Sequence, residues 1–153
     1  MCSSDLASPA LKQNITTYLS QYRMVNDSVN IKDGFIINIG VNFDVIILPN
    51  YNSNEVLSKC ILALQNYFAI DKWQINQPIV LRNIYILLDA IEGVQTVKNI
   101  EITNLVGEDL GYSKYAYSIP AATSANVIYP SLDPSIFEVK YPNQDIQGRV
   151  VNL

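Results

Sequence analysis

The chain has 153 residues, of which 49% are apolar and 16% charged, a composition typical of one globular domain and unlike that of a disordered chain. Its net charge of −4 and its scattered basic residues argue against a nucleic-acid-binding groove. The chain has no histidine, so it lacks the usual general base near neutral pH and the commonest metal ligand. No apolar stretch is long enough to predict a membrane span.

The first six residues, MCSSDL, resemble the translation of one reading frame of a common sequencing adapter. We therefore predict that residues 1–6 are an artefact and exclude them from the fold. The alternative is a natural polar N-terminal tail. Residues 7–153 are predicted to form a single α+β domain, which the artefact would make the C-terminal fragment of a larger subunit.

The first predicted helix begins at Ser8-Pro9, because serine is a good N-cap and proline suits the first helical position. It extends to about Arg23. Its apolar residues recur at helical spacing, and they are Leu11, Ile15, Tyr18, Leu19 and Tyr22.

The clearest strand is predicted at 35–49, FIINIGVNFDVIILP, where every second residue is apolar and Asn, Gly or Asp lies between. Its last part, Val45–Leu48, is apolar on both faces and is expected to be buried on both. Gly40 is expected to mark a bulge, since a strand of this length usually bends.

Two amphipathic helices are predicted after this strand. Asn52 and Glu55 have the spacing of a capping box at the start of the first one. Cys60 falls in the apolar stripe of that helix and is predicted to be a small buried hydrophobe and not a reactive thiol, which would need a base. The second helix is expected to begin at Pro78 and to end at Gly93 as its C′ glycine.

A second long strand is predicted at Val94–Leu105, where β-branched residues dominate. The order strand, helix, helix, strand predicts a two-layer β-α-α-β core, in which both helices cover one face of a sheet. Trp73 lies in the connector between the helices. It is interpreted either as packed between them or as an exposed anchor.

The segment 106–134 is rich in Gly, Pro, Ser and Tyr and has no clear period. A loop of this length is usually functional or ordered by a partner. Its tyrosines, Tyr112, Tyr115 and Tyr117, suit recognition because the ring is large, stiff and amphipathic. The alternative is that they pack onto their own sheet.

The last residues are predicted to form a C-terminal β-hairpin. Residues 137–141 and 146–151 alternate between apolar and polar positions, and a turn separates them. With the N-terminal helix, this hairpin completes the predicted α+β fold.

No group of residues has the pattern of a catalytic site. Glu108 and Asp109 are adjacent in a glycine-flanked loop and are interpreted as solvated charge, not as an acid/base pair or a calcium site. Without histidine the serines cannot form the usual triad, although a Ser-Lys dyad stays open. The glycines do not form a phosphate loop. We predict no catalytic, cofactor-binding or metal-ligating residue and no enzyme activity.

Two segments carry a resemblance to a known family. Residues 72–97, KWQINQPIVLRNIYILLDAIEGVQTV, resemble the C-terminal region of the baseplate wedge protein of contractile-tailed bacteriophages, in the baseplate J-like family. The shared pattern is a helix ending near an aromatic (66–68), a connector (73–78), and a helix closed by Gly-Val before a strand. The ending, residues 136–151, is similar to the end of the same protein. The likeness covers about 35–153, and the family's large N-terminal part is missing.

The resemblance implies a structural virion protein without a cofactor or a small-molecule substrate. Such subunits form dimers and rings around the tail hub, hold neighbouring wedge proteins and the start of the sheath, and rearrange when the sheath contracts. The expected partners are therefore a second copy and other baseplate wedge or tail proteins, not nucleic acid or a membrane. The expected location is the tail baseplate of the virion, after assembly in the bacterial host cytoplasm.

The interface is expected in the long loop, in the terminal hairpin and at an open sheet edge, which can accept an added strand. The candidate interface residues are Tyr112, Tyr115, Tyr117, Phe137, Val139, Tyr141 and Trp73. Two other functions stay open. The Tyr- and Asn-rich loops suit a receptor- or carbohydrate-binding tail module, and a small hydrolase of unfamiliar type is the third reading.

Overall fold

The structure is a computed structural model that describes residues 8–22, 31, 33–131 and 133–152. The predicted artefact at 1–6 lies outside the described residues. The helices are α1 (Pro9–Ser20), α2 (Ser53–Tyr67), α3 (Leu81–Asp89), α4 (Ile119–Ala122) and α5 (Pro142–Asp145), with 3-10 turns η1 (Ile70–Lys72) and η2 (Glu108–Leu110). The strands are β1 (Phe35–Ile47), β2 (Ile79–Val80), β3 (Val94–Asn104), β4 (Thr123–Ser124), β5 (Val127–Ile128), β6 (Ser135–Glu138) and β7 (Ile146–Val150).

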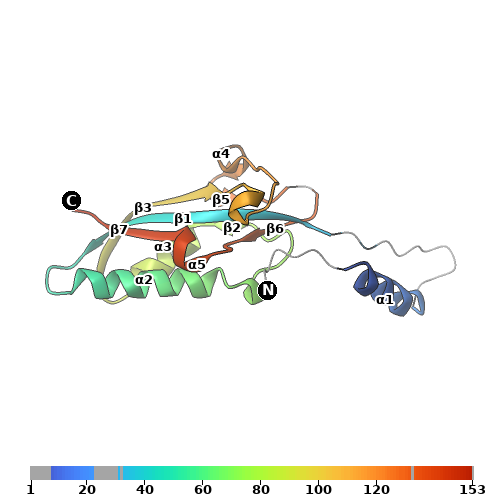
Figure 1. Ribbon diagram of the computed structural model, residues 1–153. Coiled ribbons are helices and arrows are strands. Elements are labelled where there is room, and N and C mark those ends of the chain that lie inside the picture. Colours follow the sequence, from blue (N-terminus) through green and yellow to red (C-terminus); the bar gives the residue numbers. More distant parts are fainter. Residues whose placement is uncertain (1–7, 23–30, 32, 132, 153) are drawn as a thin grey trace.

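The main sheet is built around β1, the longest strand (Figure 1). β3 runs antiparallel along one side of it. On the other side lie β6 and then β7, both parallel to β1, with β6 beside its first residues and β7 beside Val41–Val45. The predicted α+β class is confirmed. The predicted C-terminal hairpin is wrong, because the single turn of α5 moves the chain along β1 without reversing its direction.

The helices α2 and α3 lie on one face of this sheet (Figure 1), where α2 contacts β7 and α3 contacts β3. Alternate residues of β1 point into this layer, as their period of two predicts. Burial of these apolar side chains from water is the main favourable term holding the two layers together. The core between them includes Ile37, Ile39, Val41, Phe43 and Val45 of β1, Val56, Cys60 and Leu64 of α2, and Ile84 and Leu88 of α3.

α2 follows Asn52 and buries its apolar stripe as predicted, but Glu55, the predicted capping-box partner, pairs with Lys59 Nζ at 3.0 Å instead. The side chain of Asn52 accepts a hydrogen bond from the Asn54 backbone N–H at 3.0 Å, which caps the helix. Cys60 is fully buried, and burial raises the pKa of its thiol to about 11. The raised pKa keeps the reactive thiolate form scarce near neutral pH. This cysteine therefore packs as a small buried hydrophobe, as predicted.

α3 begins three residues later than predicted, at Leu81. The residues before it, Ile79 and Val80, form β2 and pair with β5, which agrees with the strand preference of β-branched side chains. The helix ends at Asp89, so Gly93, with a φ of 97°, is not its C′ residue. It lies in the turn that leads into β3.

The bulge expected at Gly40 is absent from β1. A Cβ at Gly40 would lie 3.0 Å from Thr103 Oγ1, so this glycine permits close packing. The irregularities fall further along, between Asp44 and Val45 and between Ile46 and Ile47. The first of them leaves Lys98 of β3 without a partner residue in the register, which changes the side-chain alternation there.

The described residues of the segment 106–134 pack on the rest of the same chain. It contains η2, α4 and a β4–β5 hairpin whose turn residues, Ala125 and Asn126, both have positive φ. β5 also pairs with β2, which forms a second, three-stranded sheet. Across the described part of the chain, no helix is both long and apolar enough to cross a membrane.

Candidate interaction surfaces

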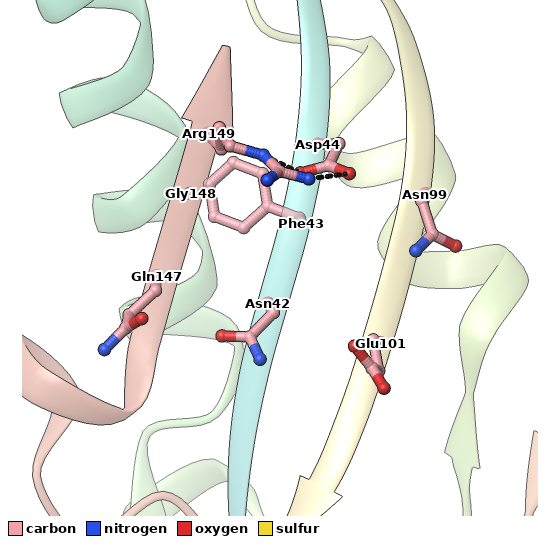
Figure 2. A pocket seen from close by; sticks show the side chains of 8 residues that line it. All are labelled: Asn42, Phe43, Asp44, Asn99, Glu101, Gln147, Gly148 and Arg149. Carbon is pink, nitrogen blue, oxygen red and sulfur yellow. Dashed lines mark hydrogen bonds and ion pairs between the residues drawn. The ribbon is translucent and has the colours of Figure 1, made fainter. Parts of the chain in front are cut away.

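The face of the main sheet that points away from α2 and α3 is open along its second half. Figure 2 shows polar side chains from three neighbouring strands on this face. They line a hollow of 510 Å³ together with Phe43 and Gly148, and they are Asn42, Asp44, Asn99, Glu101, Gln147 and Arg149. The hollow therefore offers amide and carboxylate groups and the Arg149 guanidinium, but no exposed aromatic ring, because Phe43 is buried in the core.

An ion pair crosses this open face. The Arg149 Nε and Nη2 atoms each donate to a carboxylate oxygen of Asp44 at 3.0 Å (Figure 2). The hydrogen bond with Asp44, and then its negative charge, raise the pKa of Arg149. Such a two-pronged contact fixes the register of β7 against β1 more than it stabilises the fold, since exposed ion pairs contribute little.

The first half of the same face is covered by the segment that follows β3. The fully buried Asn38 accepts a hydrogen bond from the Ser113 N–H at 2.6 Å. Asn104 donates from its Nδ2 to the Asn38 carbonyl at 2.9 Å and accepts from the Tyr117 N–H at 2.9 Å. Two asparagines of neighbouring strands thus hold the tyrosine-rich segment on the sheet.

Tyr112 and Tyr141, two of the predicted interface residues, meet at a buried carboxylate. The Tyr112 hydroxyl donates to Asp145 Oδ1 at 2.6 Å, and the Tyr141 N–H donates to Asp145 Oδ2 at 3.0 Å. The two rings are 5.5 Å apart, edge to face. Burial and the hydrogen bond to Asp145 raise the pKa of Tyr112 to about 12. The contact joins the long segment to α5, so it stabilises the chain's own fold.

This contact predicts a stability change in alkali. An unfolded tyrosine titrates near 10, whereas folded Tyr112 keeps its proton up to about 12. Between these values the folded state binds more protons than the unfolded state, so the free energy of unfolding falls as pH rises. Urea denaturation at several pH values in this window measures the change. The free energy of unfolding of Tyr112→Phe is expected to fall less steeply with pH than that of wild type. Equal slopes would contradict the contact.

Tyr115 and Tyr117 pack beside the first residues of β1 and are half-buried. The Tyr115 ring stacks on Phe35 with centroids 4.6 Å apart, and Tyr117 meets Phe137 edge to face at 6.1 Å. The Tyr117 hydroxyl donates to the Tyr129 carbonyl. Packing on their own sheet is therefore the main role of both rings. A hollow of 430 Å³ beside Phe35, Tyr112 and Tyr115 leaves part of them accessible.

The other three interface candidates lie in the core. Phe137 is 1% exposed, since it faces the helical layer once β6 pairs with β1. Val139, directly after β6, is 7% exposed. Trp73 is 6% exposed and packs against Tyr67 and Phe68, with ring centroids 5.5 and 5.2 Å away. These residues are corrected from surface anchors to core residues. For Trp73, the packed alternative holds.

One long strand edge stays open. β3 pairs with β1 on one side, and no strand of the described residues pairs with its other side. Its exposed residues include Lys98 and Glu101, charges of the kind that discourage unspecific edge pairing. Asp89 Oδ1 of α3 accepts a hydrogen bond from the Val97 N–H of β3 at 3.2 Å. A strand added at β3 would meet the exposed charged side chains, which would restrict which strand is accepted.

The N-terminal helix is the second unpartnered feature. Figure 1 shows α1 apart from the two layers, and none of its residues is buried. Lys12 Nζ makes an ion pair with Asp33 at 2.6 Å, close to the start of β1. The helix begins as predicted, with Ser8 capping it through a hydrogen bond from the Leu11 N–H at 3.2 Å. Its apolar side chains, by contrast, are not buried in the core of the described chain.

Neither the comparison with protein-family models nor the comparison with curated proteins finds a match for this chain.

Proposed function

We propose that this chain is a structural part of a phage tail baseplate wedge. It would assemble through protein–protein contacts into a ring around the tail hub and take part in the rearrangement linked to sheath contraction. Its partners would be further copies of itself and other wedge or tail proteins, in the virion. The likeness of residues 72–97 and 136–151 to the baseplate J-like family motivates this proposal.

The observation that carries the proposal is the exposure of α1. An isolated helix of 12 residues is marginal in water, and most helical stability in proteins comes from packing of the apolar face. In α1 none of these apolar side chains is buried within the described chain. A subunit with such a helix beside a well-packed body is suited to be completed by another polypeptide.

The body supports the same role. The layers of β1, β3, α2 and α3 share one apolar core, which favours a rigid platform. The open edge of β3 gives the platform a second place for a partner. A platform with two separate contact elements suits a subunit that must touch more than one neighbour.

Immunogold electron microscopy tests the proposal directly. Antibodies against this protein, applied to a phage lysate in which its gene is expressed, are expected to label the baseplate end of contractile tails. Labelling of heads, or of no virion at all, would contradict it. Pre-incubation with the purified protein should abolish the label and serves as the control for specificity.

A receptor- or carbohydrate-binding tail module is the second candidate. The hollow at Asn42, Asn99 and Glu101 favours it, since amides and carboxylates are good hydrogen-bond partners for hydroxyl groups. A glycan array tests this candidate. Binding of a glycan to wild type that is lost in Glu101→Gln and in Asn99→Ala would support it. An array without bound glycans would weaken it.

A further inference from the structure

Residues 106–118 form a strap that crosses the first half of the open sheet face, between β3 and the buried Ile119. None of these residues, all of which the structure describes, is buried, and Leu110 is 64% exposed. The half-buried rings of Tyr115 and Tyr117 supply most of its apolar contacts. Segments that bury little apolar surface open locally at a low free energy. The strap therefore has little apolar packing to hold it closed.

Hydrogen bonds to side chains of the sheet hold the strap in place. The Ser113 N–H donates to Asn38 Oδ1 at 2.6 Å. Further along the strap, the Tyr117 N–H donates to Asn104 Oδ1 at 2.9 Å. Both N–H groups can bond to water when the strap lifts, so each of these hydrogen bonds contributes only a small net stability.

The side chains beneath the strap are polar. In the described part of the chain, the buried polar or charged residues are Asn38, Ser135, Glu138 and Asp145. Asn38 and Glu138 are partners in the register of β1 and β6, so they share this face, and Asp145 accepts the hydroxyl proton of Tyr112 in a hydrogen bond. The Asn38 Nδ2 atom finds no hydrogen-bond partner among the described residues. Polar groups regain hydration when such a cover opens, which lowers the free energy of opening.

The first part of the strap is bonded to itself. The N–H groups of Leu110 and Tyr112 both donate to the Gly107 carbonyl, at 3.1 and 2.9 Å, and the Gly107 N–H donates to the Ser113 carbonyl at 3.4 Å. These hydrogen bonds lie within the strap, so they are kept when it lifts, and the turn 107–113 moves as one body. Gly107 has a φ of 140°, which gives the chain after β3 freedom to turn at this point.

We propose that the strap opens and closes as one unit over Asn38, Glu138 and Asp145 while the two layers of the body stay folded. The closed state is the one that the structure shows, and in the open state the polar groups of both surfaces are hydrated. This opening goes beyond the proposed baseplate role and does not depend on it.

Opening enlarges the polar sheet face that Figure 2 shows. Tyr112 of the strap and the buried Asp145 line a hollow of 370 Å³. This hollow shares Asn42 and Gln147 with the hollow of 510 Å³ further along the face. Lifting the strap removes the Tyr112 wall and joins the area over Asn38 to both hollows. The strap thus sets how much of the polar face a ligand or partner can reach.

Native-state hydrogen exchange of the full chain, measured by NMR at several low urea concentrations, tests the opening. After correction for intrinsic rates, the Ser113 and Tyr117 amides are expected to exchange at similar rates, roughly a hundredfold or more faster than the β1 amides. Their exchange should depend only weakly on urea, because the opening exposes little surface. Rates and urea dependence equal to those of β1 would overturn the proposal. So would unprotected exchange of the strap amides, or unrelated protection at Ser113 and Tyr117.

Tyr112→Phe tests whether the strap opens as one unit. The variant removes the hydrogen bond to Asp145 in the first part of the strap. It is expected to speed exchange of the Tyr117 amide roughly tenfold, although the hydrogen bond of that amide to Asn104 is untouched. A Tyr117 amide that keeps its wild-type rate in Tyr112→Phe would show that the two ends open independently and would contradict the single unit.

Tyr51→Phe is the matched control. It removes a hydrogen bond from another tyrosine hydroxyl to a carboxylate, that of Glu92, at a place outside the strap. The Tyr117 amide is expected to keep its wild-type exchange rate in this variant. The fluorescence of Trp73, which lies in the core, verifies that both variants are folded. The wild-type exchange rates decide the proposal even where a variant does not fold.

Discussion

Replacing Trp73 by alanine is expected to lower the free energy of unfolding by about 3–5 kcal/mol, the usual cost of removing a large buried aromatic side chain. The indole packs beside Tyr67 and Phe68 at the end of α2, and it lines a hollow together with Leu87 of α3. Its loss would leave a cavity where the two helices meet the connector. Chemical denaturation followed by circular dichroism measures the change, since the fluorescent reporter is removed.

Trp73→Phe is the matched control. It keeps an aromatic ring and removes the indole N–H, which is buried and finds no hydrogen-bond acceptor among the described residues. Because an unsatisfied buried donor is itself costly, this variant is expected to lose much less stability than Trp73→Ala. If Trp73→Ala lost less than about 1 kcal/mol, the packed role of Trp73 would be refuted and an anchor role favoured.

Gly148→Ala is expected to lower the free energy of unfolding by about 2–3 kcal/mol through overpacking. A Cβ at this position would lie 2.3 Å from Phe43 Cζ and 2.7 Å from Leu57 Cδ1. Phe43 is only 2% exposed, so its ring cannot move aside without disturbing the core. Thermal unfolding is expected to show a melting temperature several degrees lower, at about 2–4 °C for each kcal/mol in a domain of this size.

A double-mutant cycle with Phe43→Leu tests this mechanism. The smaller leucine side chain should relieve the clash, so the double variant is expected to be more stable than the sum of the single effects predicts. Gln147→Ala, on the exposed face of the same strand, is the control and is expected to be near neutral. Additive effects of Gly148→Ala and Phe43→Leu would contradict the close contact.

The local elements were largely predictable from the sequence. The period of two at 35–47 and the stripe around Cys60 predicted most of what is buried, because these patterns reflect which side faces the core, although Phe35 is 43% exposed. The N-caps at Ser8 and Asn52 were also predictable, since capping depends on the neighbouring residues alone. The start of α3 was not, because β2 pairs with a strand almost fifty residues away.

Long-range pairing was the least predictable part. Alternation at 137–141 and 146–151 indicated two strands, but it cannot tell whether they pair with each other or each with β1. For the same reason, Phe137 and Val139 were wrongly placed at a surface. The roles of Asn38 and Asn104 were also missed, since polar residues in a strand usually mark a solvated face. The role of Asp145 was missed because residues 142–145 were predicted to be only the turn of a hairpin.

Hydrogen–deuterium exchange of the full chain at low and high concentration is the most direct test. It shows whether α1 needs a partner for a stable fold while the two-layer body does not. The backbone amides of α1 are expected to exchange fast in dilute solution and to become protected at high concentration, while those of β1 and α2 exchange equally at both. Equal exchange of α1 at both concentrations, or concentration-dependent protection of β1 and α2, would contradict assembly through α1 onto a preformed platform.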